Sequence, residues 1–372
     1  MSGTSGLTPA ISGKTLVFCP IGLGNFLMAT PSLEFFSRTL GRDNLAILAL
    51  KPGIRDLAQA SGFFGEIFHW DPDKQGWATG LRVLGRIRRA GFRRSLALFP
   101  TSHWKFGIFA LLSGIRFRAG FRYPHQRWPE RLQRLSVPLE PGAHDVDQNI
   151  RLAEAFVGKP FPSPARPLFP LSPAPPPDFG GRPYFVCHPG SSAERGMREK
   201  RLPAKAFADL IRRIHGEFGW QGLLIGGPEE QALRAEIAAL APEAALLHPS
   251  RSLEEVAGQI QGAKFFLGND SGLMHVAAAL GKSCLAFFGP TDASRTGPYG
   301  PGHLVLRRRD LACSPCWRLD TVGRNPPCIY GDIRCLRDYP VDEAWKEIRG
   351  FCESMVNSGQ WPVVSGQSPG VL

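Results

Sequence analysis

The stretch FFLGNDSGLMHVAAALGK places several chemically competent side chains at a single point. An apolar run stops at Asn269, then Asp270, Ser271 and Gly272 lead directly into an alanine-rich segment that carries His275. This order predicts a buried strand followed at once by a helix, whose first N–H groups lack partners and attract anions. Asp and Ser also cap many helices, and a lone His is often a core residue, so the stretch alone is equally consistent with ordinary capping.

Three other predicted strand ends in the same half of the chain carry a similar mixture of glycine, hydroxyl and acidic residues. They are His188-Pro189-Gly190-Ser191-Ser192, Ile225-Gly226-Gly227-Pro228-Glu229 and Phe288-Gly289-Pro290-Thr291-Asp292. In a doubly wound sheet, ligands bind at the carboxyl ends of the strands. The four strand ends together therefore predict a nucleotide site. No stretch completes G-x-G-x-x-G or G-x-x-x-x-G-K-[ST], which argues against a dinucleotide-binding oxidoreductase and against a nucleotide hydrolase.

Four of the eight cysteines crowd into one short segment with the spacing C-x₂-C-x₁₁-C-x₆-C: Cys313, Cys316, Cys328 and Cys335. Paired thiolates at this spacing suit a tetrahedral metal site, with zinc as the default and iron as the alternative. Disulfides are the competing interpretation and are disfavoured in a reducing cytoplasm. We expect a structural metal site there.

The elements that position these residues alternate between strands and helices. Strands are predicted at 15–20, 45–50 and 95–100, and the alternation restarts at YFVCHPG after a dense proline cluster near residue 160. Prolines disfavour helices and interrupt strand ladders, so the cluster is interpreted as a linker. The pattern predicts an α/β chain with two doubly wound Rossmann-like domains that face each other across a cleft.

Composition sets further bounds. The chain has 372 residues, 43% of them hydrophobic, which is enough to fill two cores. It has neither a long apolar run nor a leader-like N-terminus, so we expect a cytoplasmic protein. The formal charge of +12 is concentrated between Arg82 and Arg134, where Glu130 is the one acid. Such a face would attract an anionic lipid surface, although a solvated basic surface is the plainer alternative; nucleic acid is not expected, because its binding motifs are missing.

The sequence resembles a known family in several motifs. These are HPGSS with KRLP, IGGPEE, NDSGLMHVAAALG and FGPTDASRTGPYG in the second half, and more loosely GLGNFLMATPSL in the first half. In these motifs the chain is similar to glycosyltransferase family 9, the ADP-heptose:lipopolysaccharide heptosyltransferases. The resemblance implies the GT-B fold and metal-independent transfer of heptose, with inversion, from ADP-heptose to a lipopolysaccharide core or related anionic acceptor.

The resemblance also implies roles for individual residues. Lys200, before the L-P step, matches the lysine that contacts the donor phosphates and offsets the charge of the departing diphosphate. Glu229 matches the acid that binds the adenosine ribose, and His275 matches a histidine that braces the phosphate-binding turn. The remaining expected donor contacts are Ser191, Ser192, Asp270, Ser271, Gly272 and Thr291.

The first loop departs from the family pattern. The family places a catalytic aspartate after the loop glycine, whereas Asn25 follows Gly24 here. An amide cannot accept a proton at pH 7, although its oxygen can orient a hydroxyl. Another residue such as His103 could act as the base, the acceptor could differ, or catalysis could rely on positioning and leaving-group stabilisation alone.

These observations give one leading assignment and its alternatives. We expect a cytoplasmic glycosyltransferase, peripheral on the inner membrane, that needs no cofactor for transfer. The alternatives are a transferase of the same fold with another nucleotide-sugar or a protein acceptor, and a non-catalytic nucleotide-binding relative. The expected organisation is a flexible N-terminus (1–14), an acceptor-binding domain (15–165), a proline-rich linker (166–182), a nucleotide-sugar-binding domain (183–340, with the cysteine segment 313–335), a C-terminal helix (341–356) and a flexible tail (357–372).

Overall fold

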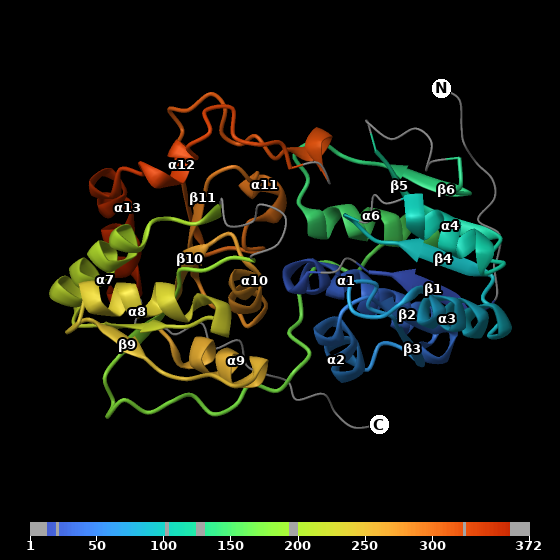
Figure 1. The fold of residues 1–372 in the computed structure, drawn as a ribbon, viewed down its shortest axis with the longest axis horizontal. Coiled ribbons are helices and arrows are strands. Elements are labelled where there is room, and N and C mark those ends of the chain that lie inside the picture. Colours follow the sequence, from blue (N-terminus) through green and yellow to red (C-terminus); the bar gives the residue numbers. More distant parts are fainter. Residues whose placement is uncertain are drawn as a thin grey trace. The chain divides into compact units, whose positions relative to one another are not determined.

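The chain folds as two compact units (Figure 1). Unit 1 comprises Met1–Leu171 and Leu319–Arg324, and unit 2 comprises Ser172–Arg318 and Asn325–Leu372. The computed structural model describes residues 13–19, 22–100, 104–123, 131–192, 200–322 and 325–357. Among the helices within these ranges, none is both long enough and apolar enough to cross a bilayer. The expected flexible termini fall largely outside the described residues.

Unit 1 is built on a parallel sheet with the strand order β3-β2-β1-β4-β5-β6. Every residue of β1 and β2 is buried, as expected for parallel strands that are covered by helices on both faces. The strands are β1 (Thr15–Phe18), β2 (Leu45–Ala49), β3 (Glu66–His69), β4 (Arg94–Ala97), β5 (Phe117–Arg122) and β6 (Leu135–Pro138).

The helices of unit 1 are amphipathic crossovers between these strands. Val83 and Ile87 of α3, with Ala110 of α4, pack against the sheet core, while Phe36 of α1 meets Phe156 of α6 edge to face. The helices are α1 (Leu23–Leu40), α2 (Pro52–Ser61), α3 (Trp77–Arg89), α4 (Trp104–Leu112) and α6 (Asp145–Val157), with the short 3₁₀ turn η1 (Arg42–Asn44) before β2.

Unit 2 repeats the architecture with the strand order β12-β11-β10-β7-β8-β9, again all parallel. Its strands are β7 (Tyr184–His188), β8 (Gln221–Leu224), β9 (Ala245–Leu247), β10 (Phe266–Asn269), β11 (Cys284–Phe288) and β12 (Leu304–Arg307). Its helices and 3₁₀ turns are α7 (Ala204–Phe218), η3 (Pro228–Glu230), α8 (Gln231–Leu240), α9 (Leu253–Gly262), α10 (Gly272–Ala279), α11 (Ala293–Thr296), α12 (Arg334–Arg337) and α13 (Val341–Asn357). The turn η4 (Leu319–Thr321) belongs to unit 1.

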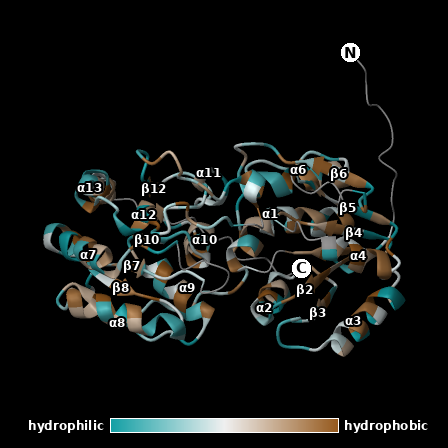
Figure 2. Cartoon of the chain, turned by 45° about the horizontal axis from the view of Figure 1, so that its top comes forward, coloured by the Kyte–Doolittle hydropathy of each residue, from teal (hydrophilic) through white to brown (hydrophobic). Residues whose placement is uncertain are grey.

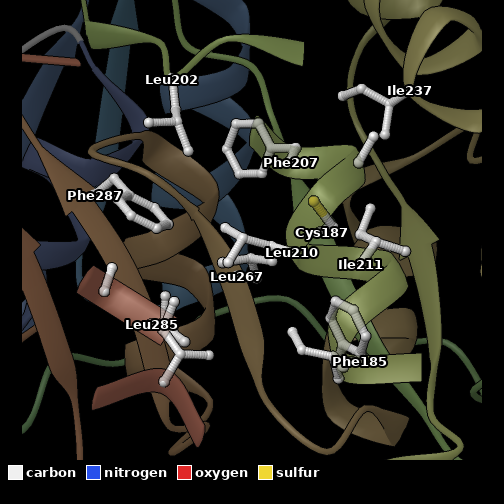
Figure 3. Close-up of a cluster of buried hydrophobic side chains, with 14 of the residues drawn as sticks. Phe185, Cys187, Leu202, Phe207, Leu210, Ile211, Ile237, Leu267, Leu285 and Phe287 are labelled. Atoms are coloured by element: carbon white, nitrogen blue, oxygen red, sulfur yellow. The ribbon is translucent and has the colours of Figure 1, made fainter. Parts of the chain in front are cut away.

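The core of unit 2 forms where α7 packs on the sheet (Figure 3). Phe207 of α7 meets Phe287 of β11 edge to face, with ring centroids 6.3 Å apart. Phe185 of β7 stacks on Phe265 at 4.9 Å. This packing fixes the strands of unit 2 rigidly, so that the loops at their carboxyl ends start from fixed positions.

The α/β fold class with two Rossmann-like units is confirmed. The strands predicted at 45–50 and 95–100 are observed as β2 and β4, which end at Ala49 and Ala97, so the last residues of each run belong to the following loop. β1 ends at Phe18, and Pro20, the last residue of the predicted strand 15–20, lies outside the described residues. The segment after FGPTD contains the short helix α11, whose first turn is capped by the Asp292 carboxylate accepting from the N–H of Ser294 at 3.1 Å.

Candidate functional site

Strands β7 and β10 lie side by side at the centre of the unit 2 sheet, and there the strand order changes direction. The chain runs from β7 through β8 to β9 on one side, and from β10 through β11 to β12 on the other. Such a reversal leaves a crevice at the carboxyl ends of the two central strands, where open α/β sheets bind ligands. His188 ends β7 and Asn269 ends β10, so both stand at this point.

His188 joins three loops that are far apart in the sequence. Its Nδ1 lies 3.0 Å from the Ser271 hydroxyl and its Nε2 lies 3.1 Å from a carboxylate oxygen of Glu230. An ionised carboxylate only accepts hydrogen bonds, so Nε2 carries a proton and donates to Glu230. All three side chains are buried. The imidazole is therefore a fixed connection between the ends of β7, β8 and β10.

Two cations approach this connection from the segment before α7. The Lys200 ammonium lies 2.9 Å from the Asp270 carboxylate, and both side chains are largely buried, at 13% and 6% exposure. The Arg201 guanidinium donates to the Ser191 hydroxyl at 3.0 Å and also to the Ser191 carbonyl. It lies 3.6 Å from Glu230 as well. Two cations thus balance two carboxylates.

The backbone around these pairs is held by Asn269. Its side-chain oxygen accepts from the N–H of Leu202 at 3.0 Å, and its amide donates to the Pro189 carbonyl at 2.8 Å. Gly190 is required here for a different reason: a Cβ at this position would lie 1.6 Å from the Glu230 carboxylate. The HPG turn therefore packs directly on the buried acid.

The structure resolves what Ser271 does. It is the N-cap residue of α10, but its side chain does not cap the helix and bonds to His188 instead. Among the described residues, the first-turn N–H groups of α10 therefore receive no cap from the Ser271 side chain. The residue before Ser271 is Asp270, which pairs with the Lys200 ammonium. Unpaired helix N-termini beside a cation favour an anion. Ordinary helix capping therefore does not explain the Ser271 hydroxyl.

Glu229 and Glu230 are adjacent in the turn η3 but differ in environment. Glu229 is exposed. Glu230 is 3% exposed and accepts from the Gly227 N–H at 3.1 Å. Burial alone would raise the pKa of Glu230, but the hydrogen bond and charge of His188, the Gly227 N–H and the Arg201 charge together lower its pKa below the ordinary value. Glu230 is therefore ionised at neutral pH.

The sequence predicted part of this cluster and missed part of it. The structure brings Ser191, Ser271, Asp270 and Lys200 together, whereas Ser192 is exposed at the end of the described loop. The members that sequence reasoning missed are His188, Arg201, Glu230 and Asn269. Each stood inside a quoted motif or next to one, but only its long-range partner reveals its part in the cluster.

Three other predicted donor residues lie on the neighbouring elements. Gly272 begins α10, and His275 is buried one turn further along the same helix. Thr291 follows β11, and its hydroxyl is buried with no hydrogen-bond partner among the residues described. A buried hydroxyl without a partner is a candidate ligand contact.

In unit 1, Gly24 and Asn25 occupy the first turn of α1, which follows β1. β1 and β4 are neighbours at the point where the strand order of this sheet reverses, so Asn25 stands at the ligand-binding end of unit 1. Its side chain is half-buried and forms no hydrogen bond within the described ranges. The other suggested base, His103, lies outside the described residues.

Comparison with known proteins identifies the family. The model of glycosyltransferase family 9 (heptosyltransferase) matches residues 83–324, which is well over half of the chain. The chain belongs to glycosyltransferase family 9. The family 9 match includes the whole charged cluster of unit 2 and ends shortly before the last two cysteines of the cysteine segment.

The relatives of this family 9 member match it at modest sequence identity. Lipopolysaccharide heptosyltransferase 1 of Pseudomonas aeruginosa is 31% identical over 197 residues, 50% of this chain and 51% of the relative. The chain thus spans about half the length of the curated relatives it matches.

Solved structures share the fold at low identity. The Escherichia coli ADP-heptose lipopolysaccharide heptosyltransferase II matches with a TM-score of 0.67 at 20% identity, covering 93% of this chain and 100% of that one. The dodecameric iron-containing heptosyltransferase TibC, in complex with ADP-D-β-D-heptose, matches with a TM-score of 0.56 at 17% identity, covering 94% and 81%. These likenesses establish the GT-B fold for this family 9 chain.

The four predicted metal-binding cysteines of this family 9 chain line one pocket in unit 2. Cys313, Cys316, Cys328 and Cys335 share it with the aromatic rings of Trp317 and Tyr330. All four are free thiols, and the predicted alternative of disulfides is not observed. As they stand, no three His, Cys, Asp or Glu side chains of the described residues form a metal-coordinating group.

The donor set of this pocket nevertheless fits a thiolate-bound metal. Burial alone would raise the pKa of the Cys328 thiol, but the backbone N–H groups of the turn that follows it lower its pKa below the ordinary value. Such N–H groups stabilise the thiolate form, which is the form that binds a metal. Burial and, to a smaller extent, the neighbouring thiols of Cys316, Cys328 and Cys313 raise the pKa of Cys335 to about 11.

Proposed function

We propose that this protein is an inverting glycosyltransferase that transfers heptose from ADP-heptose to a lipopolysaccharide core or a related acceptor. The observation that carries the proposal is the uncapped N-terminus of α10 beside the Lys200–Asp270 pair at the switch point of unit 2. Membership of the heptosyltransferase family supports the choice of sugar, and the ADP-D-β-D-heptose complex of TibC supports the choice of nucleotide.

In this proposal unit 2 binds the donor. The Lys200 ammonium has three N–H bonds and gives one to Asp270, so the others can bind the β-phosphate. The first N–H groups of α10 and the hydroxyl of Thr291 face the same negative charge. Glu229, which is exposed on η3, accepts from the ribose hydroxyls. The Asp270 carboxylate itself does not face phosphate, because like charges repel; it holds the lysine.

The proposed reaction is a single displacement at the anomeric carbon. The acceptor oxygen forms a bond to that carbon while the bond to the β-phosphate oxygen breaks, and ADP leaves with the electron pair. The acceptor proton passes to a base or to water. Negative charge grows on the departing phosphate, and Lys200 stabilises it without a bound metal ion. Attack from the face opposite the leaving group inverts the configuration.

Unit 1 is proposed to bind the acceptor, with Asn25 orienting the attacking hydroxyl. A half-buried amide with no partner of its own can accept from that hydroxyl through its oxygen. It cannot remove the proton at neutral pH. The presence of Asn25 where the family has an aspartate also favours a second candidate function, a nucleotide-binding protein that performs no transfer.

Calorimetric titration tests the proposed function. We expect ADP-heptose and ADP to bind, and UDP-glucose and GDP-mannose to give no heat. Transfer to a heptose-deficient lipopolysaccharide core, followed by mass spectrometry, then separates the enzyme from the second candidate. Binding of none of the nucleotides would overturn both.

Replacing Asn25 with alanine should chiefly impair acceptor use. We expect the acceptor KM to rise about tenfold, because that factor corresponds to the loss of one hydrogen bond between neutral groups. The affinity for ADP-heptose should be unchanged. Steady-state kinetics with varied acceptor measures this. Asn44→Ala is the control, because that amide bonds to the Leu40 carbonyl at the surface. Unchanged kinetics for every acceptor would remove Asn25 from the site.

We also propose that Cys313, Cys316, Cys328 and Cys335 bind zinc or iron. The metal would cross-link the segment structurally and would supply no step of the transfer. Elemental analysis of anaerobically purified protein should find a stoichiometric metal, and its removal by a chelator should lower the melting temperature. Cys316→Ser should abolish metal binding, while Cys352→Ala, in the core of α13, should retain it. A purified protein that contains neither zinc nor iron in stoichiometric amount would refute the proposal.

A further inference from the structure

Two helices of unit 1 expose large apolar side chains to solvent. Trp77 of α3 is 81% exposed and Leu81 is 67% exposed, while Leu111 and Leu112 of α4 are about half exposed. Single exposed leucines are common on soluble proteins, but a group that includes a bare indole ring marks an interaction surface. In Figure 2, α3 carries both hydrophobic and hydrophilic positions along its length.

These side chains belong to one continuous surface. Trp77 and Leu81 are one helical turn apart on α3 and share a face. The ring of Trp70 packs against Trp77, with centroids 6.0 Å apart, and stacks on Phe109 of α4 at 6.3 Å. At the other end of α3, Arg88 donates to the Leu112 carbonyl at 3.4 Å. Contacts thus join α3 to α4 at both ends.

Three arginines of this surface lie in a stretch of sequence that contains no acid. No acid occurs in the sequence from Lys74 to Pro129. Arg82, Arg88 and Arg89 are exposed, and among the described residues their side chains donate to carbonyls and to the Thr79 hydroxyl. Within the described part of unit 1 none of the three forms an ion pair. By contrast, Arg86 on the same helix lies 3.8 Å from Glu66 and covers the Phe68 ring.

We propose that this α3–α4 surface, formed by Trp77, Leu81, Arg82, Arg88, Arg89, Leu111 and Leu112, docks on an anionic lipid bilayer. An interfacial site needs apolar side chains to enter the headgroup layer, arginines to meet lipid phosphates and an indole at the boundary. All three are present, and uncompensated arginines would repel a second copy of the same surface. The inference deepens the proposed function by naming where the protein meets the membrane, but it does not depend on the donor.

Vesicle sedimentation tests the surface. The full chain is mixed with vesicles of equal parts phosphatidylcholine and phosphatidylglycerol, or of phosphatidylcholine alone. We expect binding to the anionic vesicles only. Arg82→Ala/Arg88→Ala should weaken it by about 25-fold, since each arginine near such a surface contributes roughly fivefold. Trp77→Ser/Leu81→Ser should abolish the binding that persists at high salt.

Matched variants on unit 2 provide the controls. Arg251→Ala/Arg309→Ala removes the same charge, and Leu247→Ser removes an apolar side chain that is 54% exposed. Both should bind like the unaltered protein. Equal loss in these controls, equal binding to neutral vesicles, or a dimer in solution that Trp77→Ser disperses would each overturn the proposal. Calorimetry with ADP-heptose on the same variants should be unchanged, so a failure of membrane docking is distinguishable from a failure of the donor assignment.

Discussion

Replacing Lys200 with alanine is expected to lower the kcat of transfer by about 10²- to 10³-fold, the range found when one preorganised charge stabiliser is removed. Two effects act together. The departing diphosphate loses its nearest cation, and the Asp270 carboxylate, which is 6% exposed and 2.9 Å from the ammonium, loses its partner. An unpaired buried carboxylate then repels the donor phosphates as well. Steady-state kinetics at saturating acceptor measures kcat and the donor KM.

Two further variants separate these effects. Lys200→Ala/Asp270→Asn removes the repelling carboxylate, so it should recover donor affinity but not kcat. Lys205→Ala is the matched control, because this exposed lysine of α7 pairs with Asp209 on the surface, and its kinetics should be unaltered. A Lys200→Ala enzyme with a kcat within about threefold of the original would remove Lys200 from leaving-group stabilisation.

The parts of the fold that could be predicted from sequence are those whose burial leaves no ambiguity. β1, β2, β7, β10 and β11 are buried at every position and read as short apolar runs. The edge strands β3 and β9 are only partly buried, and their sequences, EIFH and ALL, carry no comparable pattern. A strand at a sheet edge forms because it pairs with the adjacent strand, and the local sequence does not encode that pairing.

The candidate site likewise contains residues that could be predicted from the sequence and residues that could not. The strand ends could be found because glycine, hydroxyl and acidic residues follow apolar runs. The choice between Glu229 and Glu230 could not, because both follow the same Gly-Gly-Pro turn and only the backbone of η3 directs one of them inward. His188 could not be assigned either, since its partners are 42 and 83 residues away in the sequence. The family resemblance named the residues that we propose to face the ligand and left out the buried residues that contact them.

Glu230 and Glu229 should therefore respond differently to the same substitution. Glu230→Ala is expected to lower the free energy of unfolding by about 3–5 kcal/mol, because it leaves His188 and the Gly227 N–H without their partner in a buried place. Glu229→Ala should leave stability unchanged and weaken ADP binding, since we propose that its exposed carboxylate binds the ribose. Urea unfolding and calorimetry on both variants measure the two effects. Equal loss of stability in both variants would contradict the assignment of a structural role to Glu230 and a ligand-binding role to Glu229.

The acid dependence of stability gives a second test of Glu230. Its pKa is lowered in the folded protein, chiefly by His188 against the effect of burial, so its contribution is complete above the unfolded pKa of about 4.3 and is lost as the pH falls through the folded value. Glu230→Gln keeps the shape but cannot ionise, so its deficit in stability should be constant near neutral pH and should shrink in acid. A deficit that does not change with pH would mean that the side chain acts through shape and not through charge.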